Sequence, residues 1–292
     1  MELNTEEITT PPRPAATVVL LRDAGPGLEV LMMKRHGESD AFGGAYVFPG
    51  GKLDPDDHAP GLLGRVDAAV DALHAALGEP QLAPETAAAL FVAAVRETFE
   101  ECGILMAHGA DAAATEHAMR RARQGLGFGE LADELDLRLR IAAMVPWTRW
   151  ITPRLASVSR KRFDTRFFVA EVSEGAVARH DEREAIDAVW MSPRAALERY
   201  WEREIELAPP QIQSLAHLAR FSRTADVLAE ARDRPPPLIE PEPFEEDGLR
   251  VIVYPGDPRH SVQRRAMPGP TRLRHRQGRF EPVSGSFEGL FD

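Results

Sequence analysis

Residues 96–104 read Arg-Glu-Thr-Phe-Glu-Glu-Cys-Gly-Ile, and they decide how the rest of the chain is interpreted. Three carboxylates in this stretch, those of Glu97, Glu100 and Glu101, stand three and four positions apart. Side chains at that spacing are neighbours on one face of a helix, where like charges repel by roughly a few tenths of a kcal/mol per pair. The repulsion becomes a gain if a hard divalent cation binds between them. The alternative is a solvated acidic helix face.

Glycines before this stretch and near its end favour the interpretation that it binds a metal. Gly103 closes the acidic segment, where a helix C-cap is expected. Gly50 and Gly51 form a turn after Phe48 and Pro49, and glycine there lets a backbone carbonyl approach the carboxylates closely. Carboxylates and a carbonyl are the oxygen donors that a hard divalent cation prefers. We therefore expect a metal site between the glycine turn and the acidic helix.

With these residues in view, the chain resembles the Nudix hydrolases. Gly51, an acid at Asp57 and the stretch 96–104 match the signature of that family, which is called the Nudix box. Two positions depart from it, since Asp57 stands where the family usually has Glu and Thr98 where it usually has an aliphatic residue. Residues 58–90 also interrupt the box with an insertion. The branch of peroxisomal acyl-CoA diphosphatases is known for such an interruption.

The resemblance implies an α/β fold, namely the α/β/α sandwich with a mixed sheet, here with a helical insertion in the box and a C-terminal extension. It implies hydrolysis of a nucleoside diphosphate derivative with Mg²⁺ or Mn²⁺. Glu100, Glu101 and the Gly50 carbonyl would bind the first metal. Glu97 would bind a second metal or act as the base, and Arg96 would orient a carboxylate. A binding module of the same fold without catalysis is the competing interpretation.

Further site residues are expected outside the box. Glu184 precedes Trp190 at the spacing at which many Nudix enzymes carry an extra carboxylate, so it is a candidate metal ligand or base. Arg35 and Arg166 are the candidate phosphate contacts, because guanidinium pairs with phosphate in a bidentate manner. Residues 31–51 resemble the segment that accompanies the box in coenzyme A diphosphatases. The substrate is therefore expected to be CoA or acyl-CoA, with NADH and ADP-ribose left open.

Composition restricts the partners. The chain has 292 residues and a formal net charge of −11, which argues against a surface that wraps nucleic acid. A single cysteine, Cys102, fits a reducing compartment and is expected to be a small buried residue. No secretory signal or apolar span is evident, so we expect a cytoplasmic protein that does not enter a membrane. Whether it forms a homodimer stays open.

Hydrophobic periodicity and turn residues predict the elements along the chain. We expect a disordered tail at 1–14, a Nudix domain at 15–205 and an extension of helices and strands at 206–292. Strands are expected at 16–21, 28–33, 141–151, 163–172 and 249–254. Helices are expected at 65–77, 84–102, 115–123, 129–135, from 193, at 209–219 and at 224–232. The proline-rich stretch 234–243 is expected to be a stiff connector outside the core.

Overall fold

The computed structural model describes residues 6–25, 27–35, 44–155, 161–172 and 185–292. Within these ranges the main sheet consists of eight strands: β1 (Arg13–Ala24), β2 (Gly27–Arg35), β3 (Tyr46–Val47), β4 (Gly50–Lys52), β5 (Met144–Ile151), β6 (Phe163–Glu171), β7 (Ala185–Met191) and β8 (Leu238–Ile239). Their order is β3-β2-β1-β6-β5-β8, with β4 also beside β1 and β7 also beside β2. The pairs β1–β6 and β5–β8 are parallel, and the others are antiparallel. The predicted mixed sheet is thus confirmed.

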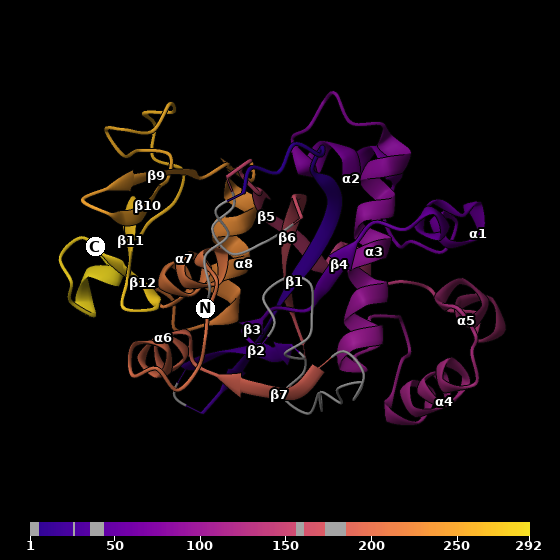
Figure 1. Ribbon diagram of the computed structural model, residues 1–292. Coiled ribbons are helices and arrows are strands. Elements are labelled where there is room, and N and C mark those ends of the chain that lie inside the picture. Colours follow the sequence, from indigo (N-terminus) through magenta and orange to yellow (C-terminus); the bar gives the residue numbers. More distant parts are fainter. Residues whose placement is uncertain (1–5, 26, 36–43, 156–160, 173–184) are drawn as a thin grey trace.

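Helices cover both faces of this sheet (Figure 1). One face carries α2 (Val70–Leu77) and α3 (Pro84–Cys102), and the other carries α6 (Pro193–Trp201), α7 (Pro209–Leu218) and α8 (Thr224–Asp233). Successive side chains of β1 point to opposite faces, so Val18 packs in the α3 cluster and Val19 in the α7–α8 cluster. The α/β/α sandwich is therefore confirmed.

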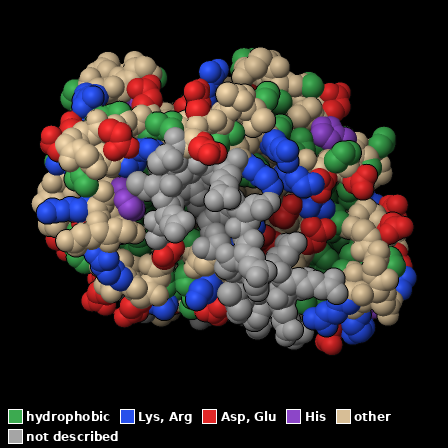
Figure 2. Space-filling view, in the orientation of Figure 1, with side chains coloured by type: hydrophobic (Ala, Val, Ile, Leu, Met, Phe, Trp, Pro, Cys, Tyr) green, Lys and Arg blue, Asp and Glu red, His purple; other side chains and the backbone are tan. Residues whose placement is uncertain are grey.

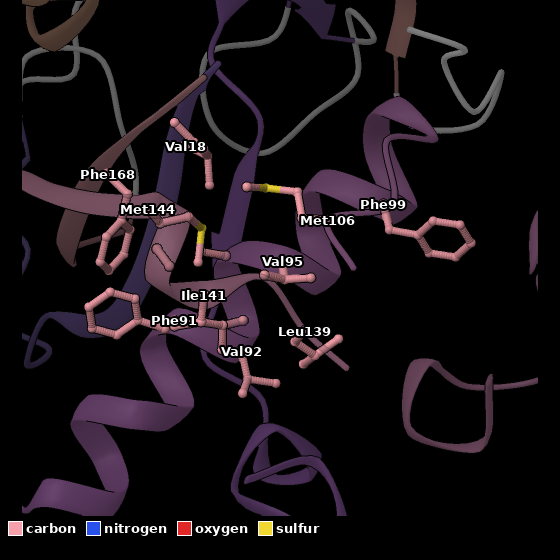
Figure 3. Packing of buried hydrophobic residues seen from close by; sticks show 14 of the residues in the cluster. Val18, Phe91, Val92, Val95, Phe99, Met106, Leu139, Ile141, Met144 and Phe168 are labelled. Carbon is pink, nitrogen blue, oxygen red and sulfur yellow. The ribbon is translucent and has the colours of Figure 1, made fainter. Parts of the chain in front are cut away.

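Helix α3 has the bounds predicted for the catalytic helix. It begins with Pro84, whose fixed φ suits the first turn, and it ends before Gly103, which takes φ 64° and donates its N–H to Phe99 O at 2.8 Å. Its apolar face lies in the core, where the ring centroids of Phe91 and Phe168 are 4.6 Å apart and the ring planes are inclined by 49° (Figure 3). This packing fixes the helix on the sheet.

The insertion is folded and packs on α3. It follows the 3₁₀ helix η1 (Pro55–His58) and contains the short helix α1 (Pro60–Leu63) and α2. The helix predicted from residue 65 begins only at Val70, because Val66 instead forms a parallel bridge with Leu139. Leu73 and Leu77 of α2 are buried in the α3 cluster. The insertion thus extends the core beside the catalytic helix.

The rest of the chain completes these two layers. Between α3 and β5 lie α4 (Ala112–Arg123), α5 (Phe128–Glu134) and the 3₁₀ helix η2 (Ile141–Ala143). The C-terminal region adds a four-stranded antiparallel sheet and a last 3₁₀ helix: β9 (Glu242–Glu246), β10 (Leu249–Val253), β11 (Arg272–Arg276), β12 (Arg279–Pro282) and η3 (Glu288–Leu290). Leu273 and Phe280 of this sheet lie in the same apolar cluster as α7 and α8. The extension therefore shares its core with the main sheet.

Two expectations about loose segments were wrong. The connector predicted at 234–243 contains β8, which pairs with β5 and buries Ile239 completely. The tail predicted at 1–14 contains the start of β1 at Arg13, and Ile8 donates its N–H to Arg154 O at 2.8 Å. Both segments gain backbone partners far away in the sequence, which local composition does not indicate. No helix in the described part of the chain is long and apolar enough to span a bilayer.

His217 makes the stability of the fold depend on pH. Its ring is buried under Trp147, with ring centroids 5.1 Å apart, and Nε2 lies 2.9 Å from Glu230 Oε1. Burial lowers the pKa of His217 below its ordinary value, although the Glu230 carboxylate raises it. The unfolded chain therefore takes up a proton before the folded chain does. The free energy of unfolding should fall as the pH drops below about 6.5.

We expect His217→Phe, which keeps an aromatic ring against Trp147, to remove most of this decline. The measurement is urea unfolding between about pH 7.5 and pH 5.5. The matched control is His117→Phe on the exposed face of α4. If His217→Phe and the wild type lose stability equally on acidification, another group is responsible.

Candidate functional site

A buried guanidinium, that of Arg96, lies at the centre of the site. Arg96 stands in the next to last turn of α3 and is 7% exposed. Its Nε and Nη2 donate to Asp57 Oδ1 and Oδ2 at 2.8 and 3.0 Å, and Nη2 also donates to Lys52 O at 3.1 Å. Arg96 therefore ties α3 to both the glycine turn and η1.

The remaining nitrogen of Arg96 holds two of the box glutamates. Nη1 donates to Glu97 Oε1 at 2.8 Å and to Glu100 Oε2 at 2.9 Å. Burial alone would lower the pKa of Arg96, but its hydrogen bonds to Asp57 and the charges of Glu97, Asp57 and Glu100 raise that pKa well above its ordinary value. Arg96 is thus a permanent cation among the carboxylates, which relieves their repulsion.

The glycine turn lies directly against the other side of the carboxylates. Gly50 donates its N–H to Glu101 Oε2 at 2.8 Å. A Cβ on Gly50, which has φ 154°, would lie 2.4 Å from Ala16 O, and a Cβ on Gly51 would lie 2.3 Å from Glu97 Oε1. Any side chain at these two positions would displace β1 or the glutamates. The sequence correctly predicted that turn and helix meet here, although the contact shown involves the N–H of Gly50 and its carbonyl role stays a prediction.

Asp57 has a positioning role that sequence reasoning left unassigned. Its side chain is fully buried, and besides Arg96 its Oδ2 accepts the N–H of Asp54 at 2.8 Å, in a capping arrangement at the start of η1. Both oxygens are therefore occupied by protein donors. The Asp side chain thus reaches Arg96 with one oxygen and both Arg96 and the backbone of Asp54 with the other.

The donor set is of the right kind for a hard divalent cation, since it consists of carboxylates beside a glycine turn without side chains. Within the described residues, however, no three Asp, Glu, His or Cys side chains are placed closely enough together to hold a metal ion. Glu97 and Glu100 are turned onto Arg96, and Glu101 onto Gly50. Figure 2 shows acidic and basic side chains gathered in a hollow over β4 and the end of α3.

Two positions of the box are structural. Cys102 is fully buried, with Sγ 3.0 Å from Met33 Sδ, and burial raises the pKa of its thiol, with the charge of Glu101 adding to the effect. It is the buried small residue that was predicted. Thr98 is also buried, and its hydroxyl donates to Ala94 O at 2.7 Å. That bond satisfies the hydroxyl within the helix, so Thr can replace an aliphatic residue here.

Arg35 is the last residue of β2. The pairing of β2 with β7 shifts register between Lys34 and Arg35, so the alternation of side chains along the strand does not fix the face on which Arg35 lies. Its Nε is buried and finds no hydrogen-bond partner within the described residues. The phosphate contact of Arg35 stays a prediction.

Arg166 lies in a different environment from the predicted one. Its Nε and Nη2 donate to Glu79 Oε1 and Oε2 at 2.9 and 2.6 Å, and its Nη1 donates to Asp164 O at 2.9 Å. The guanidinium is saturated by the protein itself, which argues against the predicted phosphate contact. No sequence pattern indicated the partner, Glu79, which belongs to the insertion. Glu184 lies outside the described residues.

Three comparisons with known proteins agree on one family. A family model described as the NUDT19 Nudix domain matches residues 75–218. Acyl-coenzyme A diphosphatase NUDT19 of Homo sapiens is 30% identical over 275 residues, covering 79% of this chain and 72% of the relative. The protein of the same name from Xenopus laevis is 26% identical over 66% of this chain, which spans only 60% of that relative. A solved Nudix hydrolase from Alicyclobacillus acidocaldarius has 27% identity and a TM-score of 0.61, covering 76% of this chain and 97% of the other.

The Asp57–Arg96 pair should be essential to the stability of the site. Asp57→Asn removes the charge that faces Arg96, and breaking a buried ion pair leaves its partner uncompensated. We expect the free energy of unfolding to fall by about 3 kcal/mol in a urea titration. The control is Asp56→Asn, one residue earlier and exposed. Equal losses in both variants would show that the Asp57 contact carries no special weight.

Proposed function

The chain belongs to the Nudix hydrolases, and on that premise we propose that it cleaves the diphosphate of CoA or acyl-CoA. The products would be 3′,5′-ADP and a 4′-phosphopantetheine species. The observation that carries the proposal is the joining of Glu97, Glu100 and Glu101 to the glycine turn through Arg96 and Gly50. A module without catalysis would have no reason to keep three repelling carboxylates on one helix face.

We propose Mg²⁺ or Mn²⁺ as the cofactor. Glu100, Glu101 and the Gly50 carbonyl would hold the first ion, and Glu97 would hold a second ion or act as the base. When bound, the ions would neutralise the charge that develops on the oxygens of the diphosphate. Carboxylate oxygens suit these hard cations, which supports the choice of metal.

The residues of the chain would then divide the work. A water molecule attacks one phosphorus, the bond to the bridging oxygen breaks, and the proton of the water passes to Glu97 or, if Glu97 is a ligand, to Glu184. Before an ion binds, Arg96 would hold Glu97 and Glu100 beside the glycine turn by the contacts described above. Because its nitrogens are already bonded to carboxylates and a carbonyl, Arg96 serves as a positioning residue and leaves substrate contact to other cations.

The CoA assignment depends on recognition of the ribose 3′-phosphate. The three relatives named acyl-coenzyme A diphosphatase NUDT19 support it. CoA differs from most nucleoside diphosphates by a ribose 3′-phosphate, which requires a further cation in a protein of net charge −11. Arg35 is the cation proposed for this contact, since its buried Nε has no hydrogen-bond partner within the described residues. ADP-ribose and NADH lack this phosphate and are the substrates to compare.

Metal dependence is tested with Glu101→Gln, which keeps the size of the side chain and removes its charge. We expect kcat to fall at least about a hundredfold, which is ~3 kcal/mol of barrier, in assays of a diphosphate panel with Mg²⁺ and with Mn²⁺. Glu85→Gln, at the exposed start of the same helix, is the control and should keep full activity. Undiminished turnover by Glu101→Gln would refute the ligand assignment, and a wild type that cleaves nothing in the panel would favour the binding module.

Substrate choice is tested by comparing CoA with dephospho-CoA in the wild type and in Arg35→Ala. Removing either the 3′-phosphate or the guanidinium should lower kcat/KM by roughly tenfold or more, which is the scale of one charge-assisted contact. The two losses should not add, because they remove the same contact. Arg123→Ala on α4 controls for the loss of a surface charge. Faster cleavage of ADP-ribose than of any CoA species would move the protein out of the CoA branch.

A further inference from the structure

Glu79, which lies just after α2, links the insertion to the main sheet. Two arginines bind its carboxylate: Arg166 donates through Nε and Nη2, and Arg149 Nη1 lies 2.7 Å from Glu79 Oε2. Asp164 completes the group, accepting from Arg149 Nε and Nη2 at 2.8 and 2.7 Å. In this network of two cations and two anions, the side chains of Glu79 and Arg166 are buried, while those of Arg149 and Asp164 are partly exposed.

The two arginines belong to the same row of the sheet as the glycine turn. Arg149 is paired with Arg166 across β5–β6, Arg166 with Ala16 across β6–β1, and Ala16 with Gly51 across β1–β4. Paired residues point to the same face, so all of these positions face α2 and α3. With about 4.8 Å between strands, Gly51 and Arg166 are roughly 10 Å apart.

Glu79 is also part of the turn that starts the catalytic helix. Its carbonyl accepts the N–H of Leu82 at 3.0 Å, two residues before Pro84 opens α3, and His74 Nε2 of α2 lies 3.0 Å from the same oxygen. Glu79 therefore connects the sheet to the start of α3, because its carboxylate binds Arg149 and Arg166 and its carbonyl accepts the N–H of Leu82. At its other end, α3 meets the same row where Glu97 lies against Gly51.

We infer that Glu79 is a positioning residue for the reaction, through which the insertion sets the place of α3 along the sheet. Two contacts to one row, Glu79 with its arginines and Glu97 with Gly51, then determine where the box carboxylates stand. This inference rests on the proposed function. A misplacement of about 1 Å in such a site can cost a hundredfold in rate.

The cost of burial supports a positioning role. Replacing buried ion pairs by apolar residues of similar volume is often neutral or stabilising, so the network is a poor choice for stability alone. Its fixed hydrogen-bond geometry offers what apolar packing does not, because a bidentate pair between Arg166 and Glu79 allows one relative placement. The network also borders a cavity of about 190 Å³, lined among others by Gly78, Thr148 and Leu238. In Glu79→Ala, the space left by the carboxylate would adjoin this cavity.

The first experiment compares Glu79→Gln with Asp257→Asn. Asp257 is an equally buried carboxylate in a bidentate pair with Arg272, but it lies next to the C-terminal sheet. We expect both variants to melt at lower temperature. Only Glu79→Gln should lower kcat, by about tenfold to a hundredfold with little change in the KM for substrate, and raise the Mn²⁺ concentration needed for half-saturation. An equal loss of kcat in Asp257→Asn, or none in Glu79→Gln, would overturn the inference.

The second experiment is chemical rescue. Glu79→Ala leaves a gap beside the cavity that acetate fits, so acetate should restore much of the lost kcat, whereas neutral acetamide should not. A folded Glu79→Ala protein that acetate leaves unchanged would overturn the inference. Mn²⁺ affinity is also titrated without substrate in the wild type and in Glu79→Gln. If the wild type cleaves no diphosphate, the proposed function fails, while the shift in Mn²⁺ affinity still decides the role of Glu79.

Discussion

The site depends on one buried guanidinium. Arg96 contacts Asp57, Glu97 and Glu100. Without its charge these three carboxylates would repel one another in a region where Asp57 has no access to water. Hydrogen bonds to charged groups contribute about 1.5–3 kcal/mol each, which is the scale needed to offset the desolvation of the ions. The charge of Arg96 thus makes it possible for the chain to fold around an acidic cluster.

The same arrangement explains how the cluster can serve a cation later. Arg96 holds Glu97 and Glu100 near each other but occupies the space between them. Binding of a divalent ion under the proposed function would therefore be an exchange, in which Glu97 and Glu100 turn away from Nη1 while Asp57 keeps its two bonds to Arg96. The free-energy cost of bringing the carboxylates together is therefore offset when the chain folds, before an ion binds. Asp57 would thus have a structural role, and Glu97, Glu100 and Glu101 would take part in the reaction.

The sequence predicted those parts of the fold that local signals specify. Helix α3 was predicted with its observed bounds, because Pro84 and Gly103 mark its ends. The meeting of Gly50 with Glu101 was also predicted, since the box is a pattern of fixed spacing. Contacts between distant segments were not predicted: Leu238 pairs with Arg149 on β5, and Glu79 lies 87 positions from Arg166. A single arginine or a proline-rich stretch reads the same in sequence whether its partner is solvent or a buried carboxylate.

The central claim is that the box carboxylates gather around a divalent cation. Anomalous scattering from crystals soaked in Mn²⁺ with a non-hydrolysable diphosphate tests it most directly. The account predicts a manganese peak bounded by Glu97, Glu100, Glu101 and the Gly50 carbonyl, with Arg96 still bonded to Asp57. A saturating soak that leaves Glu97 and Glu100 on Arg96 and shows no peak between the glycine turn and α3 would contradict it.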